Sequence, residues 1–109
     1  MTPKNQTKKM EKVIVRYRVK SGRAEENEEL VKEVYKQLHK EKPADFNYAT
    51  YKLEDGLTFI HVANYAGEGK APLPGFEAFR NFTAGIKDRC DEPPAVQQLT
   101  EIGAYWFCG

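Results

Sequence analysis

The sequence has little of what marks several common protein classes. It holds two cysteines, Cys90 and Cys108, which are too few for a disulfide scaffold and lack the spacing of metal ligands. The formal net charge is only +1, so no overall field attracts nucleic acid or an anionic membrane. No apolar run approaches the ~18 residues that a membrane-spanning helix needs. We therefore expect a cytoplasmic protein with reduced thiols and with neither a nucleic-acid nor a membrane partner.

The composition is that of an ordinary folded domain. Hydrophobic residues make up 40% of the 109 residues and charged residues 30%, which is enough to build one core. Residues 1–11 are polar and lysine-rich and have no apolar stretch of the kind found in a signal peptide, so we expect a flexible tail there. No internal repeat or low-complexity segment divides the remainder. We expect a single domain over residues 12–109.

The first half of the domain shows a change of hydrophobic period. Residues 12–20 alternate like a half-buried strand, whereas Leu30, Val34 and their neighbours recur at the spacing of a helix. Ser21 is placed to cap this helix, and Pro43 is expected to stop it. The pattern predicts a strand followed by a helix.

The second half repeats the two kinds of pattern. Strand-like segments at 45–53 and 57–65 flank Asp55-Gly56, a pair that favours a type I′ hairpin turn. A helical stripe starts near Phe76 and ends before Pro93-Pro94, and residues 96–107 are expected to form the last strand. The order strand, helix, strand, strand, helix, strand predicts an α+β, ferredoxin-like β-α-β-β-α-β sandwich. In this fold a four-stranded antiparallel sheet carries two helices on one face.

The hairpin turn also predicts which side chains share a face of the sheet. With a two-residue turn Thr50 lies opposite His61 and Tyr48 opposite Ala63. The helix-covered face then carries Tyr48, Thr50, Phe59, His61, Ala63 and Tyr65. The other face carries Ile14, Tyr51, Ile60 and Val62 and has no helix of its own. Because soluble sheets do not leave such a face in water, we predict a homodimer through it.

His61 is the polar residue best suited to catalysis or ligand binding. On the predicted register it lies near Thr50, Tyr65 and, on a neighbouring strand, Tyr17. An imidazole in this setting could act as acid, base or hydrogen-bond donor to a ligand. It could equally be a core histidine whose nitrogens bond Thr50 or a tyrosine hydroxyl. We name His61 as the candidate catalytic residue, and Tyr17, Tyr48, Thr50, Tyr65 and Phe79 as candidate contacts of a small aromatic substrate. His39 and His61 are far apart in the sequence, so no metal site is expected, and no cofactor motif is present.

Two segments resemble a known family. Val-Arg-Tyr-Arg-Val-Lys-Ser-Gly at 15–22, with the helix after it, and Phe-Ile-His-Val-Ala-Asn-Tyr at 59–65 resemble the antibiotic-biosynthesis-monooxygenase-like branch of the dimeric α/β-barrel proteins. The resemblance spans residues 12–107. It implies a dimeric α/β barrel, in which two sheets pack face to face and a pocket lies between each sheet and its own helices. Some members oxidise polycyclic aromatic compounds with dioxygen and no cofactor, and others degrade heme.

Two positions depart from the family pattern. Tyr65 stands where many members have Trp, and Val15 stands about where heme-degrading members have an essential Asn. These departures argue against heme degradation. They leave cofactor-free oxygenation open, since Tyr17, His61 and Tyr65 would still line the matching pocket.

The sequence leaves three hypotheses for function. The first is a cofactor-independent monooxygenase acting on an aromatic or quinone-like compound, with His61 taking a proton from a substrate hydroxyl. The second is a non-catalytic homodimer that binds a small molecule in the same pocket. The third is a purely structural dimer whose pocket is filled by Phe76, Phe79 and Phe82. A cavity beside His61 would favour the first two.

Overall fold

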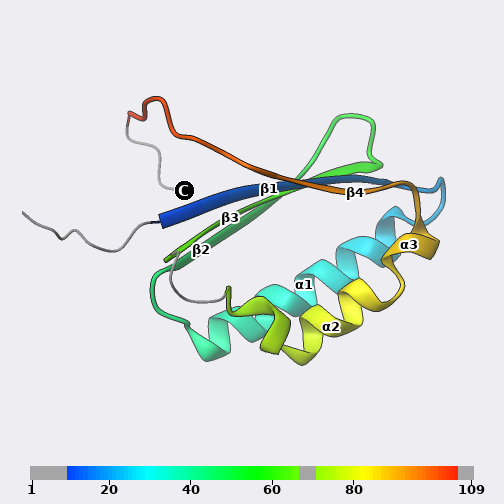
Figure 1. The fold of residues 1–109 in the computed structure, drawn as a ribbon. Helices are drawn as coiled ribbons and strands as arrows, with labels where there is room; N and C mark the ends of the chain where they lie inside the picture. Colours follow the sequence, from blue (N-terminus) through cyan, green and yellow to red (C-terminus); the bar gives the residue numbers. More distant parts are fainter. Residues whose placement is uncertain (1–9, 67–70, 106–109) are drawn as a thin grey trace, which may run out of the picture.

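In the computed structural model, which describes residues 10–66 and 71–105, a four-stranded antiparallel sheet carries its helices on one side (Figure 1). The elements are β1 (Met10–Val19), α1 (Ala24–Glu41), β2 (Phe46–Lys52), β3 (Thr58–Ala66), the 3-10 helix η1 (Leu73–Gly75), α2 (Glu77–Ala84), α3 (Ile86–Arg89) and β4 (Cys90–Gln98). The strand order is β2-β3-β1-β4. The predicted ferredoxin-like fold is confirmed. β1 begins at Met10, within the predicted N-terminal tail, whose residues 1–9 lie outside the described part of the chain.

The connection from β1 to α1 differs from the prediction. Ser21 does not cap α1: the N-cap position is Arg23, and no side chain bonds the first turn there. The Arg23 amide instead donates to the Lys20 carbonyl at 2.9 Å, and Gly22 adopts a φ of +88°. Ser21-Gly22 is therefore the corner of a tight turn, in which glycine supplies the left-handed conformation. The predicted helix end before Pro43 is confirmed.

The β2–β3 hairpin has the predicted register with a different turn. Thr50 pairs with His61 and Tyr48 with Ala63, as expected. Gly56 has a φ of +73° but Asp55 does not have a positive φ, so the turn is not type I′, which needs both. The Asp55 carboxylate accepts hydrogen bonds from the Thr58 hydroxyl and from the Leu57 and Thr58 amides, which lowers the pKa of Asp55 to about 2. These bonds fix the start of β3.

The last strand is the main error of the sequence-based prediction. β4 runs over Cys90–Gln98 and contains Pro93-Pro94, whereas the sequence pattern placed the prolines before a strand at 96–107. Proline lacks an amide hydrogen, but β4 is an edge strand that pairs only with β1 in the described sheet, so the missing donors are tolerated. The pairing with β1 shifts register twice near Arg18. Residues 99–105 have no regular structure, and 106–107 lie outside the described part.

The second helical segment is also shorter than predicted. α2 ends at Ala84, Gly85 follows as a turn, and the four-residue α3 leads directly into β4. This break lets Arg89, the last residue of α3, lie 2% exposed beneath the sheet. The position of Arg89 becomes important for the site described below.

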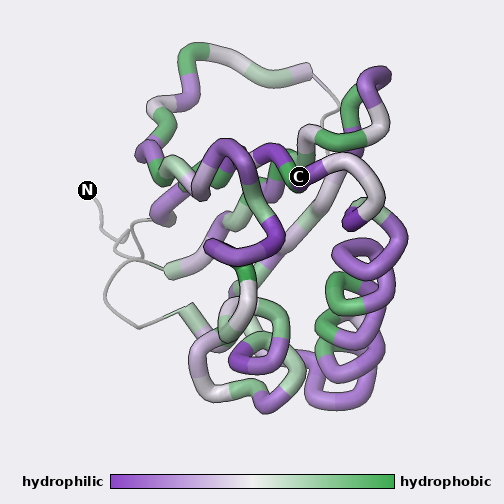
Figure 2. Tube along the Cα trace, turned by 90° about the vertical axis from the view of Figure 1, so that its right-hand side faces the viewer, coloured by the Kyte–Doolittle hydropathy of each residue, from purple (hydrophilic) through white to green (hydrophobic). Residues whose placement is uncertain are grey.

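The core lies between the sheet and the helices. Tyr17, Val19 and Phe59 of the sheet are almost completely buried with Val34 of α1 and Phe82 of α2. The tube view in Figure 2 shows hydrophobic and hydrophilic positions alternating along α1, as expected for a helix with one buried side. No helix of the described residues is long and apolar enough to cross a membrane.

Within residues 10–66 and 71–105, no helix lies over the opposite face of the sheet (Figure 1). Ile14 pairs with Val62, and Tyr51 pairs with Ile60, so the four predicted residues do share this face. Tyr51 is 54% exposed. The predicted division of the sheet into two faces is confirmed.

Candidate functional site

A cavity of about 310 Å³ lies between the sheet and its helices, beside His61. Five of the six candidate residues line it: Tyr17, Tyr48, His61, Tyr65 and Phe79. The rest of its wall is mostly apolar, with contributions that include Val13, Val15, Phe46, Leu73, Phe82 and Ile86. Phe76, which the structural hypothesis used to fill this space, lies in the core and does not line the cavity. The volume and the apolar lining are typical of a site for a small organic molecule.

His61 is 3% exposed and both of its ring nitrogens are hydrogen-bonded within the protein. Nε2 lies 2.8 Å from the Tyr17 hydroxyl. Nδ1 lies 2.7 Å from the Tyr48 hydroxyl and 3.0 Å from the Thr50 hydroxyl. Thr50 thus contacts His61 without lining the cavity. The imidazole is at once part of the cavity wall and part of the core, which combines the two readings that the sequence left open.

A second layer of polar residues supports this wall. The Asn27 amide nitrogen donates to the Tyr17 oxygen at 2.8 Å, and the Arg89 Nε donates to the Asn27 Oδ1 at 3.1 Å. Arg89 also donates to the Phe82 carbonyl at 2.7 Å. The result is a buried chain of hydrogen bonds that runs from Arg89 through Asn27 and Tyr17 to His61.

The sequence analysis missed Asn27 and Arg89. Asn27 lies four residues before Val31 and seven before Val34, on the core-facing stripe of α1. Arg89 continues the spacing of Phe82 and Ile86 on the second helical segment. A polar residue at a core-facing position was the available sign of a buried network.

Burial keeps the titratable groups of the site neutral. Desolvation lowers the pKa of His61 to about 4. Burial likewise raises the pKa of Tyr17, although Asn27 and Arg89 oppose the shift, and it raises the pKa of Tyr48. At neutral pH the imidazole and both phenols are uncharged. The Arg89 guanidinium is a buried cation with neutral hydrogen-bond acceptors, and it lies 5.3 Å from the centre of the Phe82 ring.

Ring packing fixes the orientation of these groups. The Tyr17 ring stacks on Phe59 with centroids 5.6 Å apart and on His61 with centroids 5.3 Å apart. Tyr48 stacks between Tyr35 and Phe46 at 5.4 and 5.7 Å. The polar atoms of the site therefore sit on rigid aromatic side chains rather than on a loop.

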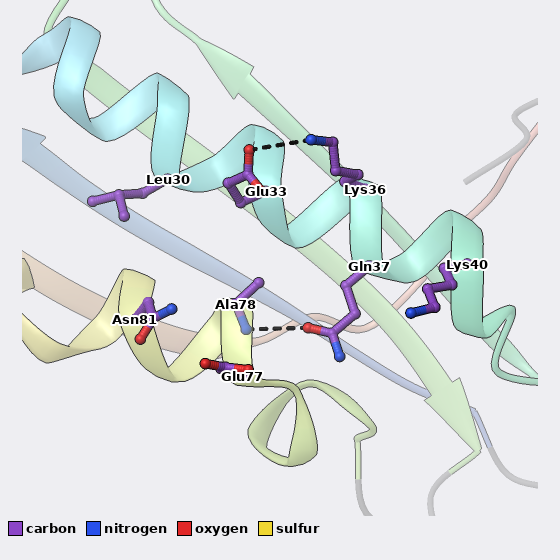
Figure 3. A pocket seen from close by; sticks show the side chains of 8 residues that line it. All are labelled: Leu30, Glu33, Lys36, Gln37, Lys40, Glu77, Ala78 and Asn81. Carbon is purple, nitrogen blue, oxygen red and sulfur yellow. Dashed lines mark hydrogen bonds and ion pairs between the residues drawn. The ribbon is translucent and has the colours of Figure 1, made fainter.

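A hollow of about 370 Å³ between α1 and α2 has a different character (Figure 3). Its polar groups satisfy one another: Lys36 pairs with Glu33, and the Gln37 side-chain oxygen accepts a hydrogen bond from the Ala78 amide at 3.1 Å. None of the predicted site residues lines it. Within the described residues no group of three His, Cys, Asp or Glu side chains gathers as a metal site would require. The cavity beside His61 is the candidate site.

No protein-family model matches the sequence, and no curated protein matches it. Solved structures do match the fold. A candidate antibiotic biosynthesis monooxygenase from Nitrosomonas europaea superposes with a TM-score of 0.72 at 17% identity, covering 88% of this chain and 93% of that one. Rv0793 from Mycobacterium tuberculosis gives 0.70 at 17% identity, covering 88% and 98%. A variant of SnoaB, a cofactor-independent oxygenase from Streptomyces nogalater, gives 0.67 at 9% identity, covering 90% and 98%.

The chain has the fold of the antibiotic-biosynthesis-monooxygenase-like proteins. The resemblance seen in the sequence is thereby confirmed at the level of the fold. These three structures are 9–17% identical to this chain, and a similarity at that level shows the fold and not the activity. The function therefore has to be inferred from the cavity itself.

Proposed function

We propose that the cavity beside His61 binds a small planar aromatic molecule and that the protein oxidises it with dioxygen, without a cofactor. The observation that carries this proposal is an apolar, aromatic cavity whose wall includes the hydrogen-bonded pair of Tyr48 and His61. The aromatic lining suits a planar ring, and the pair offers one polar contact at a fixed place. The fold that the chain shares with SnoaB, a cofactor-independent oxygenase, supports the reaction class.

The chemistry fits a ring system that carries a ketone opposite a CH2 group. Loss of a proton from the CH2 carbon to solvent water gives an enolate, which transfers one electron to dioxygen. The two radicals combine into a peroxide on the former CH2 carbon, and the peroxide takes up a proton from water. Loss of water then leaves a second carbonyl. One oxygen atom enters the product and the other leaves in water, so the net reaction removes the two hydrogens of the CH2 group.

Tyr48, held by His61, would donate a hydrogen bond to the ketone oxygen of the substrate and so stabilise the negative charge that develops there in the enolate. With a pKa near 4, the His61 imidazole does not hold a second proton at neutral pH. The imidazole can accept a proton at one ring nitrogen only while it releases the proton on its other nitrogen. That proton would go toward Tyr17 from Nε2 or toward Tyr48 from Nδ1. His61 is therefore proposed as the catalytic residue that acts through Tyr48, with Tyr17, Thr50, Tyr65 and Phe79 holding the substrate or the imidazole.

Oxygen consumption with anthrone, a three-ring ketone, tests the proposal. We expect conversion to anthraquinone above the spontaneous rate, with one atom from labelled dioxygen in the product. His61→Phe keeps a ring but removes both nitrogens, and should lower turnover about 10²–10⁴-fold. A rate equal to the spontaneous one for the wild-type protein would overturn the oxygenase proposal.

A non-catalytic binding protein is the second candidate. It is favoured by one observation, namely that both nitrogens of His61 are already bonded to protein hydroxyls. Saturable binding of anthrone with no turnover would identify this function.

We also infer that the protein acts as a cytoplasmic homodimer joined through the helix-free face of the sheet. Ile14, Ile60 and Val62 on that face are only half-buried in the single chain. Beyond β4, Ile102 is 94% exposed and Tyr105 is 87% exposed. Apolar side chains exposed to this degree are typical of a contact surface.

A further inference from the structure

Donor and acceptor chemistry fixes the direction of the hydrogen bonds around His61. The Arg89 guanidinium can only donate, so the atom of Asn27 that faces it must be the amide oxygen. The Asn27 amide nitrogen then faces Tyr17 and must donate to its hydroxyl oxygen. The orientation of the Asn27 side-chain amide is thus set by Arg89, which can only donate hydrogen bonds.

The same reasoning extends to the imidazole. Because the Tyr17 oxygen accepts from Asn27, its own hydrogen is free to donate, and His61 Nε2 at 2.8 Å is the acceptor beside it. In the opposite arrangement Nε2 would donate, and the Tyr17 hydrogen would be stranded in a side chain that is 1% exposed. Nε2 is therefore the acceptor, and the neutral imidazole carries its hydrogen on Nδ1.

That assignment determines what Tyr48 offers to a ligand. Nδ1–H donates toward the Tyr48 and Thr50 oxygens, so the Tyr48 hydroxyl hydrogen is not used by His61. The nearby Thr50 oxygen could accept this hydrogen, but Tyr35 and His61 already contact that oxygen. Tyr48 lines the cavity, where its hydrogen would meet an acceptor atom of a ligand.

We propose that Tyr48 donates a hydrogen bond to a carbonyl oxygen of the ligand, and that Asn27, held by Arg89, is the positioning residue that sets this polarity. The cavity then selects planar aromatic ketones and quinones over phenols and over hydrocarbons of the same shape. This inference rests on the proposed binding of an aromatic molecule, and does not depend on its oxidation.

Anaerobic binding of three matched compounds tests the selection. Fluorenone carries a carbonyl, 9-hydroxyfluorene a hydroxyl and fluorene a CH2 group on one ring skeleton. We expect fluorenone to bind about 2- to 10-fold more tightly than fluorene, as one net hydrogen bond allows. Tyr48→Phe should abolish this difference between fluorenone and fluorene.

Asn27→Asp tests the role of the remote residue. A carboxylate cannot donate, so the Tyr17 hydroxyl would donate to residue 27, and Nε2 would become the donor to Tyr17. Nδ1 would then accept from Tyr48, whose oxygen could only accept from a ligand. The buried carboxylate remains paired with Arg89, which favours retention of the fold. We expect the variant to prefer 9-hydroxyfluorene to fluorenone.

The tautomer can be read directly from the ¹⁵N and ¹H NMR signals of the imidazole. The wild-type protein should show the Nδ1–H form at His61, and Asn27→Asp the Nε2–H form. Asn81→Asp, an exposed Asn-to-Asp change on α2 outside the network, should alter neither the tautomer nor the preference. This control separates the effect of added charge from the effect of the network.

The outcomes separate this inference from the proposed function. Equal binding of fluorenone and fluorene, an Nε2–H tautomer in the wild-type protein, or an unchanged preference in Asn27→Asp would each overturn the inference. Failure of all three compounds to bind would overturn it as well. A fluorenone preference together with no turnover of anthrone would support the inference and refute only the oxygenase activity.

Discussion

The Tyr17 hydroxyl lies 2.8 Å from Nε2 of His61, across the pairing of β1 with β3. Through Asn27 the same hydroxyl is tied to α1, and through Arg89 to the end of α3. The wall of the cavity and the contacts that hold the sheet to its helices are thus one network. Because of this overlap, substitutions at the site should be measured for stability as well as for binding.

The first prediction concerns stability against pH. The pKa of His61 is lowered from 6.5 to about 4 on folding. Between these pH values the unfolded chain therefore binds a proton at His61 that the folded chain does not bind. As pH falls from 6.5 toward 4, the free energy of unfolding should decrease by about 3 kcal/mol, and the stability should be regained as pH rises. Urea unfolding at pH 7.5 and pH 4.5, at one fixed protein concentration, measures the change.

His61→Phe provides the control for that experiment. It removes the titrating group while keeping an aromatic ring in place, so its stability should vary much less between these pH values. Asp55, Glu26 and Glu28 have lowered pKa values, and their stabilisation is lost only at lower pH. A wild-type protein equally stable at both pH values would contradict the prediction.

The second prediction concerns the buried cation. Arg89→Met keeps an apolar stem but leaves the Asn27 oxygen and the Phe82 carbonyl without their donor. Two buried acceptors without partners should cost about 2–4 kcal/mol of unfolding free energy. Arg80→Met, at an exposed position of α2, should change it by less than about 0.5 kcal/mol. Similar values for the two variants would show that the buried bonds contribute little.

The features that could be predicted from the sequence are those that depend on local sequence pattern. The pairing of Thr50 with His61 follows from counting residues outward from the Asp55 turn, and a different turn geometry did not change it. The cavity residues on β1, β2 and β3 were therefore predictable. The bounds of β4 were not predictable. Pro93 is tolerated because β4 lies at the edge of the described sheet, and the place of a strand within a sheet is a tertiary property.

The buried network was beyond local pattern for a similar reason. Asn27 and Arg89 are 62 residues apart, and each is an ordinary helix residue in its own segment. Only the break at Gly85, which ends α2 early, brings Arg89 to Asn27. The polarity of the site therefore emerged only with the assembled structure.

The third prediction concerns the thiols. Cys90 is 7% exposed, and burial raises the pKa of its thiol, so it should react slowly with a thiol reagent in the native protein. In denaturant without reductant two free thiols per chain should titrate, counting Cys108, which lies outside the described residues. Finding none would show a disulfide and would argue against a reducing location.

The last prediction concerns assembly. Val62 lies opposite Ile14 in the middle of the helix-free face, so a lysine there would place a charge at the centre of the proposed interface. Val62→Lys should sediment as a folded monomer at micromolar concentration, whereas the wild-type protein should remain a dimer. Asn81→Lys adds the same charge at an exposed position of α2 and should stay dimeric. A wild-type monomer at this concentration would refute the dimer, and an unchanged dimer in Val62→Lys would place the interface elsewhere.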